Sequence, residues 1–297
     1  MAGPGSFPQF MVSELAAQSV KVVLGGQGGD EIFGGYARYV LAYFEQCLSA
    51  AIDGTADDGR FVVTLDSIIP NLGILKEYKP LIKSFWSRNL FEPLEQRYFD
   101  ILNRLTDMNS ILRDGVLNQD RLFESFLNRF RSPDSVPKEA YLDSMMHFDF
   151  KNLLPALPHV EDRMSMAHGL ESRVPLLDRD LVQAVARVPA DLKFGGGASK
   201  RLLKKSYPDL FPSEILQRGD KMGFPVPLSE WSRNELRGYF SDIISSSRAQ
   251  NRDYLDKSAT ASIFGEDATF SKKSWVPLSL ELWQQQFHDV SHQWKFD

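Results

Sequence analysis

The stretch VKVVLGGQGGDEIFGGY, residues 20–36, joins a short apolar run to a glycine-rich segment and an acidic pair. Residues 20–24 are apolar almost without alternation, which is typical of a strand covered on both faces in a parallel sheet. Ligands in such sheets bind at the carboxyl ends of the strands, where glycines let the backbone approach a phosphate group. The glycines that follow the strand are Gly25, Gly26, Gly28 and Gly29. The stretch therefore predicts a buried strand that ends in a phosphate-binding loop.

The acidic pair Asp30 and Glu31 opens the next turn or helix. A carboxylate at this position can face the positive end of a helix or a bound cation. The spacing excludes a Walker loop, which has Lys and Ser or Thr at these two positions. It also excludes the dinucleotide-binding fingerprint, which has a third glycine in place of Glu31. A tight strand-to-helix turn that binds nothing is the alternative interpretation.

Residues 25–36 resemble the Ser-Gly-x-Gly-x-Asp-Glu-x-Phe-Gly-Gly-Tyr signature of the asparagine synthetase family. In that family an ATP-pyrophosphatase domain adenylates the side-chain carboxylate of aspartate, and ammonia then displaces AMP. Two residues depart from the signature: Gly25 stands where serine is usual, and Gln27 stands where many members have glutamate. An amide cannot accept a proton as a carboxylate can, so the resemblance gives Gln27 no role as a base.

The resemblance implies that this block binds ATP and that Asp30 holds Mg²⁺. Lys200 matches the lysine of the family's Gly-Lys-x-x-Leu-Arg element, which faces the nucleotide, although a lysine cluster of this kind is usually a solvated helix face. The residues implied to bind the nucleotide are Gly25, Gly26, Gln27, Gly28, Gly29, Lys200 and Tyr36.

A second informative stretch is VEDRMSMAHGLESRVPLLD, residues 160–178. Its charged residues lie in apolar surroundings, and buried charges need partners, so one interpretation is a buried ion-pair network of Glu171, Arg173 and Asp178. The stretch also resembles the Asp-Arg-x-Ser-Met-Ala-x-x-x-Glu-x-Arg-Val-Pro-x-Leu-Asp motif that lines the synthetase pocket. The resemblance makes Asp162 and Arg163 candidates for catalytic contacts with substrate or nucleotide.

The segment RGDKMGFPVP, residues 218–227, resembles the Lys-x-Gly-Phe-x-x-Pro loop that closes over the site in the same family. An ammonium group there can neutralise the negative charge that develops on a leaving pyrophosphate. Lys221 is therefore the strongest cationic candidate for catalysis.

The rest of the chain has mostly helical periodicity. Helices are expected over residues 7–19, 37–51, 180–187, 229–243 and around 280–287, with a helical pattern through 71–131 and aromatic stripes that indicate core packing. Only residues 60–65 read as a further strand. With the resemblance, this predicts a mainly α fold: the carboxy-terminal portion of an α/β adenine-nucleotide hydrolase-like (ATP-pyrophosphatase) domain with an incomplete parallel sheet.

The expected synthetase-type domain covers residues 1–297 and divides into four parts. These are 1–50 with the strand, loop and helix, 51–135 as a helical insertion, 136–240 as the wall for substrate and nucleotide, and 241–297 as a terminal helical region.

Composition limits the classes of protein that fit. The chain has 297 residues, 43% of them hydrophobic, and a formal net charge of −5, which argues against nucleic acid as a partner. Its one cysteine, Cys47, excludes an internal disulfide, reads as a buried thiol and fits a reducing cytoplasm. No apolar stretch approaches the roughly 20 residues of a membrane span. His288 and His292 lie four residues apart, but a zinc site there is not favoured.

Two parts of a complete glutamine-dependent asparagine synthetase are not found in the chain: the N-terminal glutaminase domain and the Ser-Gly-Gly-x-Asp-Ser pyrophosphate loop. We therefore expect a truncated part of such an enzyme, with that missing half as partner and a homodimer as an option for the full-length form. ATP, Mg²⁺, aspartate and ammonia from glutamine are the implied reactants and cofactors. The alternatives are an inactive helical fragment or binding module, and an enzyme that amidates a different carboxylate.

Overall fold

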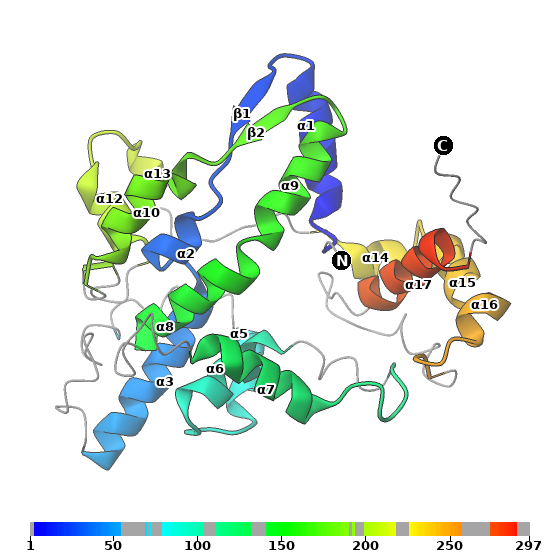
Figure 1. Ribbon diagram of the computed structural model, residues 1–297, viewed down its shortest axis with the longest axis horizontal. Coiled ribbons are helices and arrows are strands. Elements are labelled where there is room, and N and C mark those ends of the chain that lie inside the picture. The colour runs from blue at the N-terminus through cyan, green and yellow to red at the C-terminus, as the bar shows by residue number, and fades with distance from the viewer. Residues whose placement is uncertain are drawn as a thin grey trace. The chain divides into compact units, whose positions relative to one another are not determined.

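The computed structural model describes residues 3–54, 69, 72, 79–103, 111–131, 141–189, 192–193, 199–217, 226–256 and 274–289 (Figure 1). The chain forms two compact units. The larger unit comprises residues 13–103 and 120–221, and the smaller unit comprises residues 1–12, 104–119 and 222–297. Among the described residues, no helix is both long enough and apolar enough to cross a bilayer.

The larger unit is mainly helical, as predicted. Its elements are β1 Val22–Leu24, α2 Gly29–Phe33, α3 Ala37–Asp53, α5 Lys79–Trp86, α6 Leu94–Leu102, α7 Gln119–Phe130, α8 Tyr141–Phe148, the π-helix η3 Asp149–Leu153, α9 Ala156–Met166, β2 Glu171–Arg173, the 3₁₀ helix η4 Pro175–Leu177, α10 Arg179–Ala186, α12 Arg201–Ser206 and α13 Ser213–Gln217. The helices expected at 37–51 and 180–187 are confirmed as α3 and α10, and that expected at 7–19 as α1 Ser6–Ala17.

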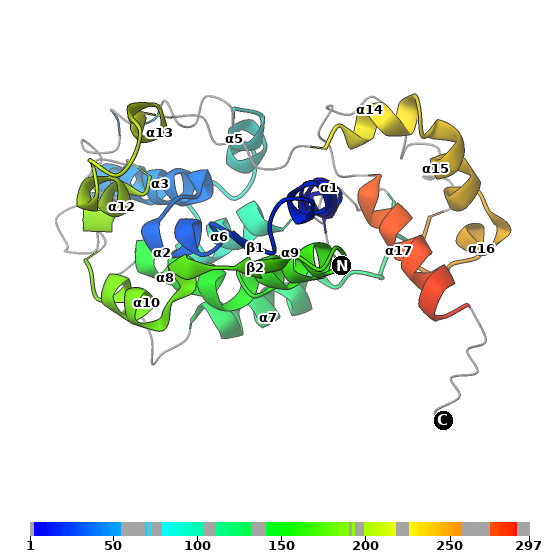
Figure 2. The same cartoon turned by 90° about the horizontal axis from the view of Figure 1, so that it is seen from above.

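A small parallel sheet of two strands joins β1 to β2 (Figures 1 and 2). Val22 pairs with Glu171, Val23 with Ser172 and Leu24 with Arg173. This confirms the predicted parallel strand, but not its expected burial on both faces. Val22 is 48% and Leu24 75% exposed, so the face of β1 on which these two side chains lie is open in the described part of the chain.

The partner strand β2 was not predicted. Residues 60–65, the only other stretch that read as a strand, lie outside the described residues. Glu171 and Arg173 do form an ion pair, but their side chains are about half exposed or more, so the expected buried network at these two residues is wrong. The two residues lie two positions apart on β2, so their side chains share one face of the sheet, and that face is exposed to solvent. Asp178 is also exposed, and its carboxylate caps the start of α10 instead of joining an ion-pair network.

The main core of the larger unit surrounds α3, against which α6 and α8 pack. The aromatic stripes predicted as core are confirmed for most of their described residues, with Tyr98, Phe126, Phe130 and Phe148 in one cluster of ring contacts. Trp86, which belongs to the same predicted stripe, is instead exposed. Cys47 is buried in the same core, and burial raises the pKa of its thiol to about 12. The interpretation of Cys47 as a buried structural thiol is therefore confirmed.

Two buried polar networks tie these helices together. Asp149, at the start of η3, accepts hydrogen bonds from Arg38, Tyr39 and Tyr98. The fully buried guanidinium group of Arg97 pairs with the Glu45 carboxylate on α3, with 2.7 Å between Nη2 and Oε2. The donors and acceptors of both networks come from several elements at once, which fixes α3 relative to α6 and η3.

The smaller unit contains α14 Leu228–Arg233, α15 Arg237–Ile244, α16 Ser247–Gln250 and α17 Trp275–Phe287 around Val226, Leu228, Phe240 and Leu278. The helix predicted over 229–243 is instead two helices, because Asn234 leaves the helical region with φ −113° and ψ −100°. Ser229, where the predicted helix begins, lies inside α14, which follows Pro227. The predicted terminal helix is confirmed as α17.

Candidate functional site

The glycine-rich loop begins where β1 ends. The Gly25 N–H donates to the Arg173 carbonyl at 2.7 Å, so the loop leaves the sheet directly from its last pair of residues. Gly28 is in the left-handed region with φ 90° and precedes α2. A β-carbon on Gly28 would also overlap the Leu177 side chain. Only glycine satisfies both conditions, so this turn between strand and helix is encoded locally.

Asp30 and Lys200 meet beside this loop. The Lys200 ammonium nitrogen lies 2.9 Å from Asp30 Oδ1, and the two side chains are 36% and 22% exposed. Asp30 comes from the first turn of α2, whereas Lys200 directly precedes α12. The structure therefore brings together the predicted nucleotide-binding lysine and the predicted magnesium ligand.

Gly35 makes room for this ion pair. A β-carbon on Gly35 would overlap Asp30 Oδ1 and would lie 2.5 Å from Lys200 Cε. The Gly35 N–H also donates to the Asp30 carbonyl at 2.8 Å, which holds the end of α2 against its start. Gly35 is thus part of the candidate site, whereas Gly34, with φ 67°, ends α2.

Tyr36, the residue after Gly35, points toward Glu31. Its hydroxyl donates to Glu31 Oε1 at 2.5 Å, and the Arg38 guanidinium lies 3.6 Å from the centre of its ring. Burial and the hydrogen bond to Glu31 raise the pKa of Tyr36. The contacts of this tyrosine are therefore structural ones, and its expected role in nucleotide binding stays a prediction.

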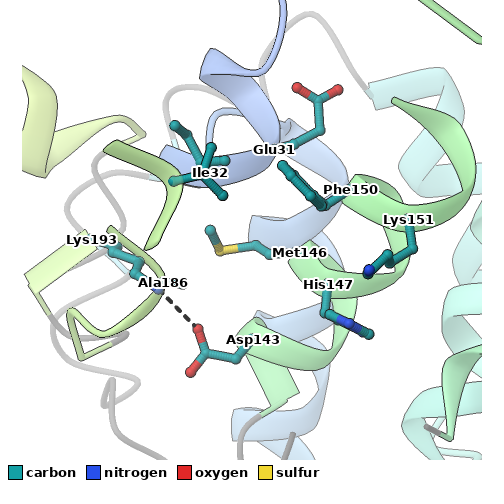
Figure 3. Close-up of a pocket in the computed structure, with 10 residues that line it drawn as sticks. Glu31, Ile32, Asp143, Met146, His147, Phe150, Lys151, Ala186 and Lys193 are labelled. Carbon is teal, nitrogen blue, oxygen red and sulfur yellow. Dashed lines mark hydrogen bonds and ion pairs between the residues drawn. The ribbon is translucent and has the colours of Figure 1, made fainter. Parts of the chain in front are cut away.

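A cavity of about 350 Å³ lies near Glu31 (Figure 3). It is lined by Glu31, Ile32, Asp143, Met146, His147, Phe150, Lys151, Val182, Ala186 and Lys193. The buried Lys193 ammonium pairs with Asp143 at 3.3 Å, and burial together with Lys151 lowers the pKa of His147. Sequence reasoning missed this cavity, although its polar residues on α8 and η3 recur every four positions, the spacing of one helix face.

Glu161 is a further site residue that sequence reasoning missed. It lies on α9, and a β-carbon on Gly25 would be 2.7 Å from Glu161 Oε1 and would overlap Gln27 Oε1. The Ser172 hydroxyl, on β2, donates to the same Glu161 oxygen. A carboxylate and an amide therefore converge on the first residue of the loop, next to the phosphate-binding candidates.

The candidates Asp162 and Arg163 are not brought to the loop in the described part of the chain. Both side chains are exposed on α9, although they directly follow Glu161. Successive side chains on a helix point about 100° apart, so Glu161 and its neighbours cannot all face the loop. Lys221 lies outside the described residues. The roles expected for these three residues stay predictions.

The described residues contain no group of three or more His, Cys, Asp or Glu side chains that could hold a metal by themselves. His288 directly follows α17, with its ring 4.3 Å from that of Trp283, and His292 lies outside the described residues.

Comparison with known proteins gives one family and several relatives. The family model described as asparagine synthase matches residues 1–285. Asparagine synthetase [glutamine-hydrolyzing] 1 of Bacillus subtilis (strain 168) is 27% identical over 95% of this chain and 43% of its own length. A putative asparagine synthetase [glutamine-hydrolyzing] of Mycobacterium tuberculosis (strain ATCC 25618 / H37Rv) is 28% identical over 98% of this chain and 43% of its own length.

A more distant relative carries a different name. The amidase chry2 of Gibberella zeae is 23% identical over 90% of this chain and 41% of its own length. The chain thus spans about two fifths of the length of these curated relatives.

Proposed function

The chain belongs to the asparagine synthase family, and we propose on that premise that it carries one side of an ATP-dependent amide-forming site. The observation that supports this most is the Asp30–Lys200 pair at the carboxyl end of a parallel strand, beside a loop rich in glycine. A cation and a carboxylate at such a loop suit a polyphosphate substrate and its metal.

In this proposal, ATP is the substrate whose phosphates lie along the loop. Lys200 would contact phosphate oxygens, and the side-chain-free backbone of Gly26 and Gly28 would approach them. Lys221 would neutralise the leaving pyrophosphate, with Asp162 and Arg163 as further contacts to substrate or nucleotide.

Asp30 fits a magnesium ligand. Mg²⁺ bound with a nucleotide takes one or two protein carboxylates beside phosphate oxygens and waters, and Asp30 offers one such carboxylate beside the loop. When bound, the ion neutralises part of the negative charge on the phosphates. Lys200, which already pairs with Asp30, holds a second positive charge at the same place.

We infer aspartate as the carboxylate that is activated, through β-aspartyl-AMP, and ammonia from glutamine as the nitrogen source. The printed names of the Bacillus and Mycobacterium relatives support this assignment. Glutamine hydrolysis and the Ser-Gly-Gly-x-Asp-Ser loop are assigned to sequence outside this chain, and the complete enzyme would be a cytoplasmic homodimer. Amidation of another acid is the second candidate, favoured by Gln27 at the usual glutamate position and by relatives named amidases.

Aspartate-dependent exchange of labelled pyrophosphate into ATP tests the proposal. The chain is assayed alone and with a separately expressed polypeptide that carries the pyrophosphate loop, in the presence of Mg²⁺. We expect exchange that requires aspartate in at least the combined sample. A panel of other carboxylic acids separates the two candidate substrates. Absence of exchange with every acid in both samples would refute the proposed function.

A further inference from the structure

We propose that Glu161 is a catalytic residue for amide formation: its carboxylate binds the incoming ammonia and takes a proton from it, while the Gln27 amide orients it. This inference rests on the proposed function, because it assigns the nitrogen nucleophile of that same site to particular side chains. It starts from a carboxylate that a helix distant in sequence brings to the first residue of the glycine-rich loop.

The position of Glu161 is set by the sheet. α9 packs beside β2, as both views show (Figures 1 and 2), and the Ser172 hydroxyl on β2 donates to Glu161 Oε1. Ser172 pairs with Val23, one residue before β1 ends. The carboxylate therefore lies at the point where β1 turns into the loop, close enough to Gly25 to conflict with any side chain there.

Two acceptor atoms at this point remain to be satisfied. Glu161 Oε2 and Gln27 Oε1 are buried and have no hydrogen-bond partner among the residues that the structure describes. Buried polar atoms in folded proteins almost always have a partner, so such a pair indicates a donor that arrives with a ligand. The other oxygen of this carboxylate, Glu161 Oε1, accepts a hydrogen bond from the Ser172 hydroxyl. This bond fixes the orientation of the unsatisfied oxygen, Oε2.

The chemistry of this pair selects the ligand. A carboxylate and an amide oxygen both accept hydrogen bonds, so they repel phosphate oxygens and attract N–H groups. Ammonia is small, carries several N–H donors and becomes positively charged as it attacks a carbonyl. The loop therefore has two ends of different character: Glu161 and Gln27 for nitrogen, and Asp30 with Lys200 for phosphate and metal.

The reaction step balances with these residues. The ammonia lone pair forms a C–N bond to the carbonyl carbon of the acyl adenylate, and the C–O bond to AMP breaks with its electrons on the phosphate oxygen. One N–H proton passes to Glu161 Oε2, and Gln27 accepts a hydrogen bond without taking a proton. Glu161 thus supplies the proton-accepting carboxylate that Gln27, as an amide, does not supply.

A purely structural role for Glu161 would be to hold β2 through Ser172. Removal of the Ser172 hydroxyl separates the structural role from the catalytic one, because it breaks the hydrogen bond but keeps the carboxylate. A purely structural Glu161 would lose its function in that variant, whereas a catalytic Glu161 would keep most of it. The two roles also differ in the half-reaction affected, because a base for ammonia takes no part in adenylation.

The experiment measures two half-reactions in the sample that shows pyrophosphate exchange. Amide formation is followed with synthetic β-aspartyl adenylate and ammonium chloride across a range of pH, and exchange is followed with aspartate and ATP. We expect Glu161→Gln to lose about 100-fold or more in amide formation, the usual contribution of a general base, and to keep exchange within about threefold. Glu124→Gln, the same change on an exposed carboxylate of α7, is the matched control and keeps both activities.

Two further variants separate chemistry from folding. Ser172→Ala is expected to lose no more than about tenfold in amide formation, and Gln27→Glu added to Glu161→Gln is expected to restore part of it, because a carboxylate returns to the same point. Thermal unfolding of each variant reports whether the fold is kept.

Three results would overturn the inference while leaving the proposed function standing. The first is amide formation by Glu161→Gln within about threefold of the unchanged protein. The second is a loss of amide formation in Ser172→Ala as large as that in Glu161→Gln. The third is a loss of pyrophosphate exchange in Glu161→Gln as large as its loss of amide formation. Absence of exchange in the unchanged protein is a different result, because it refutes the proposed function itself and with it the assignment of Glu161.

Discussion

The Lys200 ammonium group pairs with the Asp30 carboxylate across 2.9 Å, although the two residues come from segments far apart in the sequence. Neither residue is buried, so the pair adds little to stability. Under the proposed function, the lysine exchanges this partner for phosphate oxygens of a nucleotide, and the carboxylate exchanges the lysine for Mg²⁺. This relationship carries the proposed function and makes it testable at both residues.

Lys200→Ala and Asp30→Asn are each expected to lower aspartate-dependent pyrophosphate exchange by about 100-fold or more, the usual effect of removing one charge-stabilising group. Lys205→Ala removes an exposed lysine near the end of the same helix, α12, and is the control. Exchange rates at saturating ATP and aspartate check the prediction. Equal losses in Lys205→Ala and Lys200→Ala would show that only the general positive charge of α12 matters.

Gly35→Ala is expected to impair exchange although it removes neither charged side chain. The added methyl group would overlap Asp30 Oδ1 and approach Lys200 Cε, so the pair must separate. Overpacking of this kind costs about 1–3 kcal/mol, which thermal unfolding would register as a modest loss of stability. Gly238→Ala, where a β-carbon meets nothing within 4 Å, is the matched control. Unchanged exchange in Gly35→Ala would argue against a functional Asp30–Lys200 pair.

Much of the site follows from local sequence. The glycines at 25–29, Asp30 and Lys200 were recognisable from motifs because each motif is a short run of residues with its own backbone requirement, such as the left-handed Gly28. The helices and their aromatic core followed from apolar periodicity, because burial of one face leaves a repeating pattern.

The parts that were missed depend on long-range geometry. β2 is a three-residue Glu-Ser-Arg strand joined to β1 by backbone hydrogen bonds, and side-chain patterns do not encode such pairing. Glu161 was passed over for its neighbours Asp162 and Arg163, because a motif does not say which face of a helix meets the loop. The break at Asn234 was missed for a similar reason, since apolar periodicity continued across it.

Asp149→Asn is expected to destabilise the larger unit by about 3 kcal/mol, because removal of one partner leaves the mostly buried Arg38 charge uncompensated. Tyr98→Phe removes one donor to the same carboxylate and should cost about 1 kcal/mol. Urea unfolding measures both. Tyr207→Phe, at an exposed tyrosine, should change the free energy of unfolding by less than about 0.5 kcal/mol. A change in Asp149→Asn as small as that control would contradict the assigned role of this network.

Cys47 should be inert in the folded protein. Its thiol is buried, and burial raises its pKa to about 12, so little thiolate forms near pH 8. We expect alkylation by iodoacetamide at pH 8 to be at least about 100-fold slower in the native protein than in urea, as followed by mass spectrometry. Equal rates in the two conditions would mean that this part of the core opens readily.

The same thiol predicts a pH dependence of stability. Its pKa is raised from 9.0 to about 12 on folding, so the folded chain keeps a proton that the unfolded chain releases between these values. The stabilisation is therefore fully present below pH 9 and is lost as pH rises toward 12, by up to about 1.4 kcal/mol per pH unit. Cys47→Ala retains every other titrating group, so the difference in free energy of unfolding between the two proteins isolates this contribution. The unchanged protein should lose its advantage over Cys47→Ala only above pH 9, and a difference that stays constant up to pH 11 would show that the thiol does not titrate differently in the two states.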